Sequence, residues 1–155
     1  MKVHSDWYNS IGKEISLYKD TLSKKDYKKY KLDLLLRVAK RVADFSSDCG
    51  ECQMFQQEIT KLTQDLGYLV QMPNKERRKS YFKTINNIIK HLQKYHKLVT
   101  EGQNIGIWMA LGSGIGVAIG AGMESVAIGI PIGVGIGVAI GAALDAKAKK
   151  EGKVI

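Results

Sequence analysis

The eight-residue sequence GIGVAIGA occurs twice near the C-terminus, at Gly114–Ala121 and again at Gly135–Ala142. Both copies lie in the segment 105–144, where Glu124 carries the only ionisable side chain. A helix needs roughly twenty apolar residues to cross the hydrocarbon core of a bilayer, so a segment of this length with one central break predicts two spans. The predicted spans are 105–123 and 126–144.

Glycine spacing in this segment indicates how the two helices pack. Glycine disfavours a helix in water by about 1 kcal/mol per residue, yet 11 of the 16 glycines fall within 105–144. Most of them recur every four residues, which aligns them on one helix face and lets a second backbone approach closely. The predicted helix-packing interface consists of Gly112, Gly116, Gly120, Gly129, Gly133, Gly137 and Gly141.

These glycine ladders resemble the glycine-zipper two-helix membrane domains of bacterial envelope proteins. The resemblance covers the last third of the chain and implies a mode of helix packing. A second set of glycines, Gly114, Gly122 and Gly135, lies off the ladders and predicts packing against another copy of the chain. The run Gly112–Gly116 is also similar to the first helix of rotary ATPase ring subunits. In that family the ion-carrying carboxylate lies in the middle of the second helix, whereas Glu124 lies in the predicted turn, so such proton translocation is not expected.

The charges beside the apolar segment predict its orientation. Lys90, Lys94 and Lys97 precede the first span and four lysines follow the second, whereas the turn at Glu124 has no basic residue. Basic residues concentrate on the cytoplasmic side of membrane proteins, so both termini are expected in the cytoplasm. The first residues contain no apolar run typical of a secretory signal, and with only two cysteines a reducing compartment is expected. The predicted location is the cytoplasmic (inner) membrane, as a multi-pass protein.

The first hundred residues have a helical apolar period almost throughout and no candidate strand. Apolar residues recur at steps of three and four in four stretches, separated by breaks at Ser46–Gly50 and at Pro73. Stretches of this length are typical of a bundle. We therefore predict an all-α fold, with an N-terminal antiparallel helical bundle and a C-terminal two-helix transmembrane hairpin. A long coiled-coil stalk is an alternative that the breaks disfavour.

The same patterns predict the boundaries of helices and domains. The second helix is expected to run unbroken over 24–45, the third to reach Leu69 and the fourth to reach Val99. The predicted segments are a cytoplasmic helical bundle over 1–100, a junction over 101–104, the glycine-zipper hairpin over 105–144 and a basic cytoplasmic tail over 145–155.

Cysteine and histidine supply the one constellation suited to chemistry. Cys49 and Cys52 form a CxxC pair, and His91 and His96 lie on the last predicted helix before the first span. Two thiolates and two imidazoles suit tetrahedral zinc, so these four residues are the candidate metal ligands. A spacing of five separates the two histidine rings around a helix, so only one of them is expected to be well aimed. His4 is an alternative ligand.

Two other interpretations of the CxxC pair stay open. A thiol near the start of a helix can act in redox chemistry, but no βαβ pattern typical of thioredoxin-like proteins surrounds this pair. The pattern favours a purely structural interpretation, in which Cys52 belongs to the apolar stripe of the third helix and Cys49 lies in the preceding turn. Zinc at this site is the one cofactor considered, and otherwise none is predicted.

Basic residues give the chain a formal net charge of +9. The basic runs at 24–31 and 75–79 alternate with the apolar stripe positions. The simplest interpretation is that these basic residues lie on the solvent-exposed face of their helices. In a protein attached to a membrane, the same residues can contact anionic lipid headgroups. This interpretation ranks above nucleic acid binding, which uses the same residue types.

No P-loop, dinucleotide fingerprint or Ser/His/Asp arrangement is present, so an enzyme is not expected. The sequence predicts a membrane-anchored scaffold or adaptor that forms homo-oligomers through its hairpin. The basic bundle would then hold a cytoplasmic protein partner. The alternatives are an oligomeric channel-like or membrane-perturbing assembly, and a metal- or redox-sensing membrane module.

Overall fold

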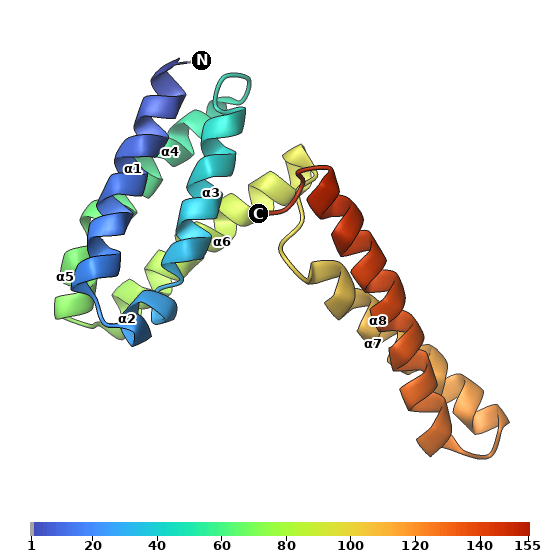
Figure 1. Ribbon diagram of the computed structural model, residues 1–155. Coiled ribbons are helices and arrows are strands. Elements are labelled where there is room, and N and C mark those ends of the chain that lie inside the picture. The colour runs from blue at the N-terminus through green and yellow to red at the C-terminus, as the bar shows by residue number, and fades with distance from the viewer. Residues whose placement is uncertain (1) are drawn as a thin grey trace. The chain divides into compact units, whose positions relative to one another are not determined.

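The computed structural model describes residues 2–155, with side chains from residue 6 onward (Figure 1). Apart from an isolated bridge between Val99 and Val154, residues 2–155 contain no strand, which confirms the all-α fold. The helices are α1 Lys2–Thr21, α2 Lys24–Lys29, α3 Leu32–Phe45, α4 Gly50–Gln64, α5 Leu66–Gln71, α6 Lys75–His96, α7 Gln103–Gly122 and α8 Val126–Lys150.

The chain divides into two compact units, of which the first extends to His96 and also includes Ile155. This unit is a helical bundle in which α3 packs against α1, α4 and α6. The four long helices α1, α3, α4 and α6 run in alternating directions (Figure 1). Burial of one apolar face from each long helix forms the core. Its fully buried side chains include Ile15, Leu35, Val38, Ile59, Ile85, Ile88 and Leu92.

Two of the predicted helices are broken in the structure. The helix predicted over 24–45 is interrupted because Lys31 adopts a left-handed backbone conformation, with φ of 52°. At this break the carbonyl of Tyr30 accepts a hydrogen bond from the buried Tyr81 hydroxyl (3.0 Å), a partner on a distant helix. The third predicted helix is divided into α4 and α5 at Asp65.

The last helix of the bundle is shorter than predicted, because α6 ends at His96 instead of reaching Val99. Lys97 takes a left-handed conformation, with φ of 55°, which stops the helix. Val99 then donates its backbone N–H to the carbonyl of Lys153 (2.9 Å). The residues after α8 therefore pair with the chain that precedes α7.

The second unit, 97–154, contains a hairpin of α7 and α8. All seven ladder glycines are buried between these two helices. A Cβ atom added at any of the seven would lie under 3.0 Å from a backbone atom of the opposite helix. The two backbones can approach this closely only because these positions lack side chains. By contrast, a Cβ at Gly114, Gly122 or Gly135 would meet nothing within 4 Å.

The outer surface of the hairpin is apolar. Both helices are long and apolar enough to cross a membrane. In the most apolar 18-residue stretch of each helix, only 17% of α7 and 22% of α8 is buried. A core helix of a soluble protein is mostly buried. The apolar residues of α7 and α8 are mostly exposed, so these helices do not resemble core helices. Exposed side chains include Ile107, Leu111, Ile115, Ile128, Ile132 and Ile136.

Candidate metal centre

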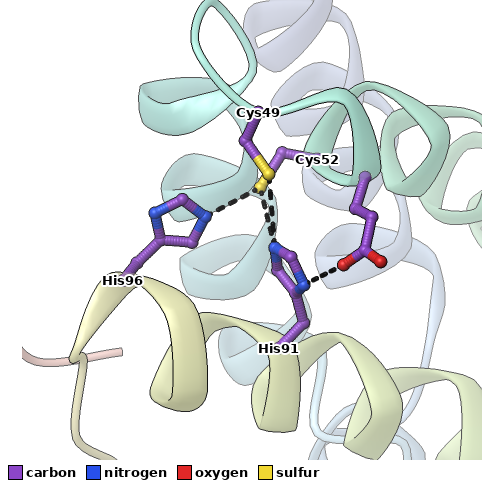
Figure 2. Close-up of polar contacts among 5 residues, drawn as sticks. Cys49, Cys52, His91 and His96 are labelled. Atoms are coloured by element: carbon purple, nitrogen blue, oxygen red, sulfur yellow. Dashed lines mark hydrogen bonds and ion pairs between the residues drawn. The ribbon is translucent and has the colours of Figure 1, made fainter.

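The four candidate metal ligands meet at one end of the bundle, where α4 begins and α6 ends (Figure 2). One potential ligand atom from each of Cys49, Cys52, His91 and His96 lies within 4.8 Å of the other three. The group therefore could hold a metal ion. Both cysteines are free thiols.

The turn before α4 places the two thiols. Cys49 is the N-cap residue of α4, and Cys52 lies in its first turn. Ser46, which ends α3, is fully buried. Its carbonyl accepts a hydrogen bond from Gln53 Nε2 (2.9 Å), and its hydroxyl accepts one from Gln56 Nε2 (3.2 Å). The start of α4 is therefore tied to the end of α3, which fixes the position of the CxxC pair.

Both histidine rings point at the sulfur atoms, so the expectation that only one of them would be well aimed is wrong. His91 Nε2 lies 3.4 Å from Cys49 Sγ and 3.6 Å from Cys52 Sγ. His96 Nε2 lies 3.4 Å from Cys52 Sγ. In Figure 2 the sulfur atoms lie between the two rings, so rings that diverge around α6 reach them from different sides. The alternative ligand His4 lies outside the residues whose side chains are described.

Neighbouring side chains hold each ring in place. The ring of Phe45 stacks on that of His96, with ring centroids 4.0 Å apart. Phe55 contacts His91 edge-on at 5.2 Å. The carboxylate of Glu51 pairs with Nδ1 of His91. A carboxylate beside Nδ1 favours the tautomer with the proton on Nδ1, in which the lone pair of Nε2 faces the sulfurs; metal-binding histidines generally have this arrangement.

Sequence reasoning did not identify Glu51 as part of the site. It lies inside the sequence CGEC, between the two candidate cysteine ligands. An acidic residue next to a ligand is a weak signal in sequence, because its role depends on the position of a histidine ring from a distant helix. The structure supplies that position.

Burial sets the ionisation of the cluster. It raises the pKa of the Cys52 thiol to about 12, with the neighbouring Cys49 and Glu51 adding to the effect. Burial also lowers the pKa of His96, with a further contribution from His91. Without a metal ion, Cys52 is therefore protonated and His96 is neutral at pH 7. A bound cation would reverse this balance at Cys52, because metal coordination favours the thiolate.

Comparison of the chain with protein-family models, curated proteins and solved structures gives no match. The donor set nevertheless specifies a type of site. With two sulfurs and two nitrogens the protein would fill all four positions of a tetrahedral metal ion, and such closed sites are structural rather than catalytic.

Proposed function

We propose that this protein is a membrane-anchored scaffold whose helical bundle is closed by a zinc ion. The observation that carries the proposal is the spacing of the donor atoms. Zn–S bonds of about 2.3 Å and Zn–N bonds of about 2.0–2.1 Å at a tetrahedral angle place sulfur and nitrogen about 3.6 Å apart. Three of the four sulfur–nitrogen distances, at 3.4, 3.6 and 3.4 Å, agree with this value, and all four ligand atoms lie within 4.8 Å of one another.

Zinc is favoured over other metal ions by the chemistry of the donors. Two thiolates and two imidazoles suit a tetrahedral borderline-soft ion, whereas magnesium and calcium require oxygen ligands. The carboxylate of Glu51 lies beside Nδ1 of His91, where zinc-binding histidines generally have an acceptor. The ion would join the start of α4 to the end of α6, two segments far apart in the sequence. Its proposed role is therefore to stabilise the bundle.

Membrane anchoring by α7 and α8 is the second part of the proposal. It is supported by their length, their exposed isoleucine and leucine side chains, and the absence of charge over 126–144. In water such a surface would be an apolar patch of the kind that soluble monomers rarely expose. In a bilayer the same side chains contact lipid, while most backbone groups are bonded within the helices. The basic residues flanking the hairpin favour cytoplasmic placement of both ends.

Self-association through the hairpin is the third part. The ladder glycines pack within one chain, so a second copy would use the open positions around Gly114 and Gly135. Close backbone contact is the main means by which helices associate in lipid. The channel-like alternative is less well supported, because the middle of each apolar helix has no charged side chain that could line a conducting path.

Metal analysis of the full-length protein in mild detergent tests the zinc site. We expect one zinc ion per chain in the unmodified protein and none after the double substitution Cys49→Ser and Cys52→Ser. His4→Ala is the matched control and should retain zinc, since the four residues of the cluster already fill the positions of a tetrahedral ion. Replacement by cobalt(II) should give the absorption of a tetrahedral thiolate complex. A zinc-exposed protein that retains no metal would contradict the proposal.

Alkaline extraction of membranes tests the anchor independently. The protein should stay in the membrane pellet when peripheral proteins are released. Recovery in the aqueous supernatant would refute membrane anchoring and leave the zinc site intact, because the site lies wholly within the first unit.

A further inference from the structure

Helix α6 carries a row of exposed basic side chains along one face. Helical geometry places this row roughly opposite the buried face that includes Ile85, Ile88 and Leu92. The one acidic residue of the helix is Glu76, in its first turn. The basic row consists of Lys75, Arg78, Lys79, Lys83, Lys90 and Lys94.

The basic row is available to a ligand. Among the described side chains, 6–155, none of the six takes part in an ion pair. Most of the row, together with Phe82, Asn86 and Asn87, lines a shallow surface depression. The ammonium, guanidinium and amide groups that line it are hydrogen-bond donors suited to phosphate oxygens. The surface therefore fits an anionic partner.

The covalent connection to α7 keeps the C-terminal end of this row near the proposed anchor. Residues 97–102 separate the end of α6 from the start of α7. A fully extended chain spans at most about 3.6 Å per residue, so the two helix ends stay within roughly 25 Å of each other. If α7 and α8 insert in a bilayer, this short linker holds the lipid headgroups at a high effective concentration near the basic row.

We propose that the basic row of α6 binds the anionic phospholipid headgroups of the bilayer into which α7 and α8 insert. This inference rests on the membrane anchoring proposed above. A row of basic side chains along one face of a helix matches a planar array of phosphates. A nucleic acid is the less suitable partner, because the one aromatic residue that lines the depression, Phe82, is half-buried and gives bases little surface to stack on. The exposed Tyr95 lies at the end of the row, beside Lys94.

Lysine labelling in nanodiscs tests the proposal with the full-length protein. One sample uses phosphatidylcholine alone and the other adds phosphatidylglycerol, and mass spectrometry follows the acetylation of each lysine. We expect Lys79, Lys83 and Lys90 to react several-fold more slowly in the anionic discs. Lys13 and Lys19 are internal controls, because they are exposed on α1, which packs on α3 and α4. Their rates should be equal in both discs.

Two further arms sharpen the result. At about 0.5 M salt the protection should disappear, because charges on the surface are then screened within a few ångströms. The variant Lys79→Gln/Lys83→Gln should lose the lipid-dependent protection of Lys75 and Lys90. The matched variant Lys13→Gln/Lys19→Gln should keep it.

Three results would overturn the inference. Equal labelling of the row in both discs would show that anionic lipid does not bind there. Stronger protection by a short RNA in phosphatidylcholine discs than by phosphatidylglycerol would assign the row to nucleic acid. Failure of the protein to enter either disc would refute the anchor itself, and the inference with it, and metal analysis of the same sample would still report on the zinc site.

Discussion

Asp145 of α8 accepts two hydrogen bonds from Asn104 of α7, one from the backbone N–H (3.2 Å) and one from Nδ2 (2.8 Å). Its second carboxylate oxygen accepts the backbone N–H of Ile105 (3.2 Å). The N-cap position of α7 is Gly102, which has no side chain to satisfy these free N–H groups. Asp145 therefore supplies the cap from the neighbouring helix and fastens the open end of the hairpin.

Replacing Asp145 with alanine should open this end. Loss of a capping side chain costs about 1 kcal/mol, and here it also removes a negative charge favoured by the helix dipole. We expect faster hydrogen exchange at the amides of Asn104 and Ile105. Glu151→Ala is the control, because the carboxylate of Glu151 pairs with Lys147 and Lys153. Unchanged exchange in Asp145→Ala would show that the cap contributes nothing.

The ladder glycines should tolerate no side chain, whereas the glycines off the ladder should. Gly116→Leu would place a Cβ 2.5 Å from the carbonyl oxygen of Gly129, so the helices must separate. We expect a loss of at least 1–3 kcal/mol in the free energy of unfolding, as for an overpacked core. Gly114→Leu makes the same change in the same helix where space is open. Denaturation in sodium dodecyl sulfate should show little destabilisation in this variant.

Self-association is testable with the same set of variants. If copies dock through the open glycines, Gly114→Leu and Gly135→Leu should lower the oligomeric state in mild detergent while the hairpin stays folded. Light scattering of the detergent-solubilised protein measures this. Oligomers that persist in both variants would contradict docking at these positions.

The hairpin could be predicted because its causes are local. Apolar length and four-residue glycine spacing are properties of one helix at a time, and they fall at Gln103–Gly122 and Val126–Lys150 in the structure. The break at Lys31 could not be predicted in this way. It coincides with a hydrogen bond between Tyr81 and the carbonyl of Tyr30, and that partner is 51 positions away.

The metal centre shows the same limit. Its four residues could be identified in the sequence because their side chains carry sulfur and nitrogen donors. Whether these donor atoms converge depends on how the start of α4 packs on the last turn of α6. Helix geometry directs the rings of His91 and His96 to different sides of α6. Both rings can bind one ion only because the sulfur atoms lie between them. Glu51 was missed for the same reason, since its partner is a ring on another helix.

Glu51 should tune zinc affinity without binding the ion. Removing the carboxylate behind a metal-bound histidine typically costs 10–100-fold in affinity, and we expect a loss of about this size in Glu51→Gln. Competition with a chromogenic zinc chelator measures it. Glu58→Gln neutralises an exposed acid on the same helix and should leave the affinity unchanged. Equal affinities in the two variants would remove Glu51 from the site.

Zinc removal should destabilise the bundle selectively. Zinc at about 100 times its dissociation constant stabilises the folded state by about 2.7 kcal/mol, and each kcal/mol shifts the Tm of a domain of this size by about 4–8 °C. Chelation should therefore lower the Tm by roughly 10–20 °C. Trp7 reports on this unit alone in a Trp108→Phe background, because its indole donates to Thr60 of α4 (3.0 Å).

The stabilisation by zinc should also depend on pH in a defined direction. Burial raises the pKa of Cys52 to about 12 in the metal-free protein, so zinc must displace a proton there, and protons compete with the ion. The difference in Tm between zinc-loaded and chelated protein should therefore shrink as the pH falls from about 8 to about 6. His96→Ala should lose most of the difference at every pH, whereas His4→Ala should keep it. A chelator response that survives in His96→Ala would place the stabilising ion somewhere other than this cluster.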